Sequence, residues 1–144
     1  MKAVVDASVA IKWYTAENHH EEAEFLLGNA IELHAPELIV PEFGNIVWKK
    51  SRAGLLPGEK AEEIIDLFLG TGIFLYRQSD LLAAAFRSAI ELNKSVYDCT
   101  YLALSKLLSL PFVTADDKFY NDVTRTDSAE FVLHIRDIES LNSR

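Results

Sequence analysis

The fold is indicated most clearly by a stretch near the start of the chain, Lys2-Ala3-Val4-Val5-Asp6-Ala7-Ser8. Its Ala3-Val4-Val5 run is apolar and β-branched, which is typical of a strand buried on both faces. A carboxylate, Asp6, follows directly, and a charge there is costly unless water, a partner or a metal meets it. Because ligands of open α/β sheets bind outside the carboxyl ends of the strands, Asp6 is a candidate site residue. The alternative is that Asp6 only caps the next helix.

The same arrangement recurs near the end of the chain. Residues 110–115 predict another apolar strand, and Asp116 and Asp117 follow it directly. Asp116 is therefore a second candidate at the end of a buried strand. The sequence leaves open whether Asp117 faces the same site.

Two further acids stand in the first turns of predicted helices. Pro41 suits a first helical turn, which puts Glu42 where the helix dipole favours a negative charge. Ser95 and Asp98 have the spacing of a capping box, with Asp98 in place of the usual Glu. Each acid thus has a purely structural explanation. However, the helix after Asp98 is almost wholly apolar, which predicts that its first turn lies deep in the fold.

Strand-like and helix-like segments alternate along the whole chain. Strands are predicted at residues 3–5, 31–35, 72–76, 110–115 and 129–135. Helical segments are predicted at 9–13, 18–28, 41–50, 59–69, 80–92 and 96–108, with a closing helical turn at 137–141. This alternation predicts one α/β domain over residues 1–144, with about five strands in a mostly parallel sheet flanked by helices.

Several local patterns predict structure rather than chemistry. Asn18 and Ser79 are the expected N-caps of the helices at 18–28 and 80–92. The His19-His20 pair lacks the i,i+4 spacing of a helical metal site, which favours a solvated helix start. In the helix at 80–92, the apolar residues follow helical spacing: Leu82, Ala85, Phe86, Ala89 and Ile90.

Composition narrows the class of protein. The chain is 49% hydrophobic and has a net charge of −8, so a globular fold is expected and a general electrostatic grip on nucleic acid is not. We expect no signal peptide and no membrane helix, because no apolar run approaches about 20 residues. The single Cys99 excludes an internal disulfide, and we expect it to be buried in a cytoplasmic protein. The basic Lys49, Lys50 and Arg52 favour a solvated helix end over a phosphate site.

Four acids share one predicted edge of the sheet: Asp6, Glu42, Asp98 and Asp116. Carboxylates gathered at one place repel, and protonation or a cation must relieve them. Oxygen ligands favour Mg²⁺ or Mn²⁺ over zinc, and such a site suits hydrolysis of phosphodiesters, with one carboxylate as a general base. Other catalytic motifs give little support for a different chemistry, because the sequence has no P-loop, nucleophile elbow or evident histidine base for Cys99. Phosphoryl transfer through Asp6 would need a second acid where this chain has Ser8.

These motifs, in this order, resemble PIN-domain endoribonucleases, specifically the VapC-like toxins of prokaryotic toxin–antitoxin pairs. The resemblance covers nearly the whole chain and rests on four stretches: Val4-Val5-Asp6-Ala7-Ser8, Val40-Pro41-Glu42 with Asn45, Tyr97-Asp98 with Tyr101-Leu102-Ala103, and Val113-Thr114-Ala115-Asp116. It implies a parallel sheet flanked by helices, a magnesium-dependent ribonuclease acting on RNA, and frequent homodimers. It also implies inhibition by a cognate antitoxin that reaches the acidic pocket with a basic side chain.

Carried over to this sequence, the resemblance implies Asp6 and Asp98 as the principal metal ligands, with Asp116 completing the metal site directly or through water and Glu42 as the fourth catalytic acid. Mg²⁺ is the implied ion, with Mn²⁺ as the second choice. Ser8 and Thr114 would be hydroxyls that support the carboxylates. The competing hypothesis is a non-catalytic PIN-like module that only docks a protein partner.

Overall fold

A parallel sheet forms the centre of the computed structural model, which describes residues 1–28 and 30–144. Within these residues the sheet has five strands in the order β3-β2-β1-β4-β5, and every neighbouring pair is parallel. The strands are β1 (Lys2–Val5), β2 (Glu32–Pro36), β3 (Phe74–Tyr76), β4 (Phe112–Thr114) and β5 (Val132–His134). The α/β prediction is confirmed, and β1, the strand before Asp6, lies at the centre of the sheet.

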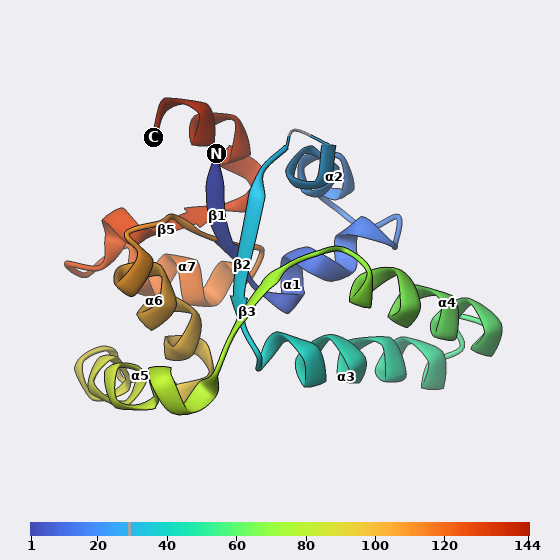
Figure 1. The fold of residues 1–144 in the computed structure, drawn as a ribbon, viewed down its shortest axis with the longest axis horizontal. Helices are drawn as coiled ribbons and strands as arrows, with labels where there is room; N and C mark the ends of the chain where they lie inside the picture. The colour runs from blue at the N-terminus through green and yellow to red at the C-terminus, as the bar shows by residue number, and fades with distance from the viewer. Residues whose placement is uncertain (29) are drawn as a thin grey trace.

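Helices cover both sides of this sheet (Figure 1). On one side α6 packs against β1, β2 and β4, and α5 packs outside α6. Helices α1 to α4 lie across the sheet from them (Figure 1). The described helices are α1 (Ala7–Ala10), η1 (Ile11–Trp13), α2 (His20–Gly28), α3 (Ile39–Arg52), α4 (Gly58–Leu69), α5 (Gln78–Leu92), α6 (Val96–Leu108), α7 (Asp117–Val123), η2 (Ala129–Phe131) and η3 (Ile135–Ser143).

Both predicted caps at Asn18 and Ser79 are wrong. Helix α2 begins at His20, because His19 has a left-handed φ of 65° and its carbonyl accepts the first helical bond, from Ala23 N–H. Helix α5 begins at Gln78, and Arg77 in extended conformation occupies the cap position. In each case the backbone conformation fixes the start of the helix, and a polar side chain alone does not.

Other boundaries shift without changing the topology. Helix α3 begins at Ile39, two residues before Pro41, which still lies in its first turn together with Glu42. The predicted strand at 72–76 is shortened to Phe74–Tyr76, and it lies at the edge of the sheet with Phe74 exposed. The predicted strand at 129–135 contains a 3-10 turn before the short strand β5.

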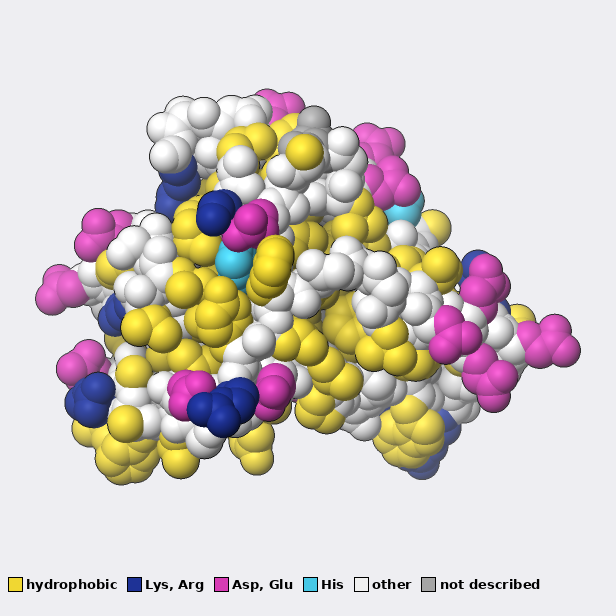
Figure 2. Space-filling view, viewed as in Figure 1, with side chains coloured by type: hydrophobic (Ala, Val, Ile, Leu, Met, Phe, Trp, Pro, Cys, Tyr) yellow, Lys and Arg dark blue, Asp and Glu magenta, His cyan; other side chains and the backbone are white. Residues whose placement is uncertain are grey.

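The apolar residues of α5 were expected to follow helical spacing, and in the structure some of them are buried while others are exposed. Leu81, Ala85 and Ser88 are buried against α6, whereas Leu82, Phe86 and Ile90 are more than half exposed. Hydrophobic side chains accordingly lie at the surface where α5 runs (Figure 2). An apolar row left at the surface is a candidate for contact with another protein.

Cys99 is fully buried between α5 and α6, as expected, and this burial raises the pKa of its thiol to about 11. The thiol is therefore protonated at neutral pH and inert. Within the described part of the chain, no helix is both long enough and apolar enough to cross a membrane.

Candidate active site

The four predicted acids line one pocket of about 130 Å³ at the carboxyl edge of the sheet. Asp6 follows β1 and Asp116 follows β4, and these two strands are neighbours. Glu42 and Asp98 come from the first turns of α3 and α6. The remaining lining residues are Ala7, Ser8, Ile46, Tyr101, Phe112 and Phe119. Residues far apart in the sequence therefore meet at this edge, as the alternation of strands and helices predicts.

Asp6 is the most enclosed of the four acids. Its Oδ1 accepts hydrogen bonds from Ser8 Oγ at 2.5 Å and from Val9 N–H at 3.1 Å, and its Oδ2 accepts one from Thr114 Oγ1 at 2.5 Å. Burial nevertheless raises the pKa of Asp6 to about 6, and the nearby charge of Glu42 adds to the increase. Asp6 therefore caps α1 and also lines the pocket, so capping is not its only contact.

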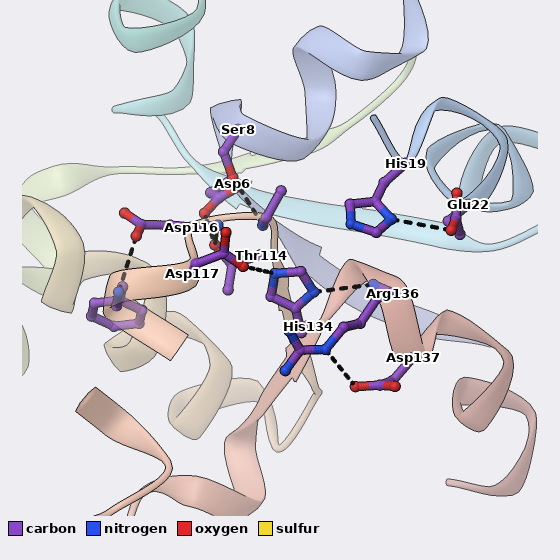
Figure 3. Close-up of polar contacts among 12 residues, drawn as sticks. Asp6, Ser8, His19, Glu22, Thr114, Asp116, Asp117, His134, Arg136 and Asp137 are labelled. Carbon is purple, nitrogen blue, oxygen red and sulfur yellow. Dashed lines mark hydrogen bonds and ion pairs between the residues drawn. The ribbon is translucent and has the colours of Figure 1, made fainter. Parts of the chain in front are cut away.

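The structure confirms the predicted contacts of the two supporting hydroxyls. Ser8 Oγ donates to Asp6 and accepts from Ala115 N–H at 3.0 Å, and Thr114 Oγ1 donates to Asp6 and accepts from Asp116 N–H at 3.1 Å. Each hydroxyl thus connects the end of β1 to the segment after β4. The two strand ends form one hydrogen-bonded unit (Figure 3).

Glu42 faces the pocket beside a tyrosine that the sequence reasoning did not assign to the site. Tyr101 Oη donates to Glu42 Oε1 at 2.8 Å, and the Tyr101 ring stacks on Phe112. Burial raises the pKa of Glu42, with a further increase from Asp98. The signal for Tyr101 was present, because residues three apart on a helix share a face and Tyr101 follows Asp98 by three.

Asp98 lies in the predicted cap of α6, where Ser95 Oγ accepts from the Asp98 N–H at 3.1 Å. Its pKa is raised by burial and by Asp116, and Lys94 and Lys118 partly offset this increase. Both lysines contact Asp122, so a small cluster of mixed charge lies on this side of Asp98.

Asp116 and Asp117 point in different directions. Asp116 lines the pocket, and its Oδ1 accepts from Phe119 N–H at 3.0 Å, which caps α7. Asp117 is not part of the pocket lining, and its Oδ1 lies 2.8 Å from His134 Nε2 (Figure 3). The question that the sequence left open is thus answered, because Asp117 turns toward the end of β5.

The donor set fits a hard divalent cation. Its donors are carboxylate oxygens from four acids, and the raised pKa values of Asp6, Glu42 and Asp98 show charges that a cation would stabilise. Among residues 1–28 and 30–144, no three His, Cys, Asp or Glu side chains already lie close enough together to hold a metal ion. This is compatible with Mg²⁺, which keeps several waters and usually binds only one or two carboxylates.

Comparisons with known proteins place the chain in a family. A family model described as PIN domain matches residues 3–122. Ribonuclease VapC3 of Pyrobaculum aerophilum is 35% identical over 120 residues, which cover 81% of this chain and 90% of that protein.

Two solved structures share the fold. PAE2754 from Pyrobaculum aerophilum has a TM-score of 0.73 at 21% identity, covering 100% of this chain and 91% of that one. A chain of the toxin-antitoxin complex from Klebsiella pneumoniae has a TM-score of 0.61 at 14% identity, covering 92% of this chain and 97% of that one.

Proposed function

This chain belongs to the PIN-domain family, and from that premise we propose that it is a magnesium-dependent endoribonuclease acting as the toxin of a toxin–antitoxin pair. The observation that carries the proposal is the meeting of Asp6, Glu42, Asp98 and Asp116 at one pocket. The relative called Ribonuclease VapC3 supports RNA as the substrate. Four acids at one pocket are unfavourable for folding, which supports a role in chemistry.

Asp6, Asp98 and Asp116 are the proposed metal-binding residues, with Mg²⁺ as the ion and Mn²⁺ as a substitute. When bound, the cation would acidify water and stabilise negative charge on the phosphate oxygens. The protein's part is to orient these carboxylates. Ser8 and Thr114 fix both oxygens of Asp6, and the Phe119 N–H fixes one oxygen of Asp116.

Glu42 is the proposed general base for the attacking water. The Tyr101 hydroxyl donates to its Oε1, and its Oε2 would accept the proton. A raised pKa suits this role, because a base works best when its pKa is close to the working pH. Tyr101 itself stays protonated, since burial and the charge of Glu42 raise its pKa far above its ordinary value.

The proposed protein partner is a cognate antitoxin with a basic side chain that reaches the acidic pocket. The net charge of −8 and the likeness to a chain of a toxin-antitoxin complex support this partner. We also propose a homodimer, supported by the exposed Leu82, Phe86 and Ile90 on α5. Light scattering of the purified protein, with Phe86→Ser as the matched variant, measures this association.

Cleavage of RNA by purified protein tests the main proposal. Asp6→Asn and Asp98→Asn are expected to abolish Mg²⁺-dependent cleavage while the circular dichroism spectrum stays that of the wild type. Undiminished cleavage by both variants would contradict the mechanism. If the wild type binds no Mg²⁺ or Mn²⁺ and cleaves no RNA, the non-catalytic docking module is the better description.

A further inference from the structure

A buried histidine lies beside the pocket and has no part in the proposed chemistry. His134 ends β5, is 1% exposed, and is paired in the sheet with Thr114 of β4. Its Nδ1 accepts a hydrogen bond from the Arg136 N–H at 3.2 Å, which places the ring proton on Nε2. Burial and the charge of Arg136 lower the pKa of His134, so the ring is neutral at neutral pH.

The Nε2 of this ring faces the first residue of α7. It lies 2.8 Å from Asp117 Oδ1, although that oxygen is off the line of the N–H, so the contact is close but poorly aligned. The rest of Asp117 is solvated, with 75% of its side chain exposed. The His134 ring also makes an edge-to-face contact with Tyr120, one turn farther along α7.

We propose that His134 is a positioning residue for Asp116, acting through Asp117. The two aspartates are consecutive, so the contact that turns Asp117 toward β5 also fixes the backbone from which Asp116 enters the pocket (Figure 3). On the other side, Thr114 Oγ1 accepts the Asp116 N–H. The start of α7 is thereby held from two adjacent strands, through Thr114 of β4 and His134 of β5.

The need for this second contact follows from the size of α7. The helix has seven residues, too few to be stable alone, and its buried side chains, Phe119 and Val123, lie beyond its first residue. Without the His134 contact, the start of α7 would be held only by Thr114 and by the Asp116–Phe119 cap, both on the β4 side. This inference rests on the proposed function, because it takes Asp116 to be a metal-binding residue.

Two substitutions of His134 distinguish the role of Nε2 from that of Nδ1. In His134→Gln the amide group reaches the place of Nε2 and keeps an N–H beside Asp117 Oδ1, whereas in His134→Asn it reaches only the place of Nδ1. Mn²⁺ affinity, measured by electron paramagnetic resonance without RNA, is expected to fall roughly tenfold in His134→Asn, as when a group that orients a metal ligand is lost. His134→Gln should retain affinity within about twofold of wild type on the same reasoning.

Asp117→Ala provides a second variant, because this exposed residue can be truncated without opening the core. It is expected to weaken Mn²⁺ binding as His134→Asn does. Val132→Ala, at a buried position in the same strand, controls for general loss of stability and should lower Tm while leaving Mn²⁺ affinity unchanged.

The outcomes are distinguishable. Wild-type Mn²⁺ affinity in both His134→Asn and Asp117→Ala would overturn the positioning role and leave the proposed function intact. An equal loss of Mn²⁺ affinity in Val132→Ala would also overturn the positioning role, because the effect would then come from general destabilisation. Wild-type protein that binds no Mn²⁺ and cleaves no RNA would overturn the proposed function and this inference with it.

Discussion

The β1–α1 and β4–α7 junctions begin with the same local design and differ in their surroundings. In each, a buried parallel strand is followed by an aspartate whose side chain caps the next helix, Asp6 through Val9 N–H and Asp116 through Phe119 N–H. Asp6 follows the central strand and receives two hydroxyl hydrogen bonds in addition. Asp116 is exposed, and its backbone N–H donates to one of those hydroxyls, that of Thr114.

The difference shows that the strand–aspartate–helix pattern does not determine the chemical state of the aspartate. Burial raises the pKa of Asp6 to about 6, so Asp6 contributes a poorly solvated charge that a cation can relieve. Asp116 remains accessible to water, so a water molecule can replace its carboxylate oxygen as a ligand when Asp116 is substituted. Four predictions use the two junctions to test this difference.

The largest expected effect is on RNA cleavage. Asp6→Asn should reduce kcat by roughly a thousandfold, equivalent to about 4 kcal/mol of lost transition-state stabilisation. Asp116→Asn should reduce kcat by only about ten- to a hundredfold, because water can replace part of its role. Single-turnover kinetics at saturating Mg²⁺ measure both rates. Equal losses in the two variants would mean that the burial of Asp6 has no bearing on catalysis.

The second prediction concerns stability against pH. Because the pKa of Asp6 rises from 3.8 to about 6 on folding, the folded protein binds more protons than the unfolded chain between these values. The ionisation of Asp6 therefore lowers the free energy of unfolding as pH rises from 3.8 to about 6, by at most about 3 kcal/mol in total. Above this range its effect on stability is constant. Asp6→Asn should remove this contribution and gain stability relative to wild type between pH 4 and pH 7.

Urea unfolding at four pH values across this range measures the difference between the two proteins. The raised pKa values of Glu42 and Asp98 act in the same direction in both proteins, so the difference reports Asp6 together with its coupling to Glu42. A constant difference across the range would contradict the raised pKa. Addition of Mn²⁺ at pH 7 should stabilise wild type and have much less effect on Asp6→Asn.

Thr114 joins the two junctions, and its hydroxyl is the subject of the third prediction. Thr114→Val keeps the shape of the side chain but removes the donor to Asp6 and the acceptor of the Asp116 N–H. The expected loss is about 2 kcal/mol of unfolding free energy, because two polar groups then lack a partner. Thr114→Ser retains the hydroxyl and should lose about 1 kcal/mol, for the deleted methyl. A smaller loss in Thr114→Val than in Thr114→Ser would show that these hydrogen bonds contribute little.

The two junctions also show how far the sequence could predict this molecule. The apolar strands followed by Asp6 and Asp116 predicted the edge of the sheet and the pocket, because parallel strands place their carboxyl ends together. Local patterns could not assign the helix starts at His20 and Gln78, since backbone conformation decided them. Nor could they find His134, whose contact with Asp117 depends on the pairing of β4 and β5 rather than on either segment alone.

The smallest expected effect separates the capping role of Asp116 from its charge. Asp116→Ser can still accept the Phe119 N–H, so the unfolding free energy should stay within about 0.5 kcal/mol of wild type. Asp116→Ala removes the cap and should lose about 1 kcal/mol. Both lack the carboxylate and should show the same reduced Mn²⁺ affinity. If Asp116→Ser instead binds Mn²⁺ like wild type, Asp116 serves only as the cap of α7, whereas Asp6 caps α1 and also faces the pocket.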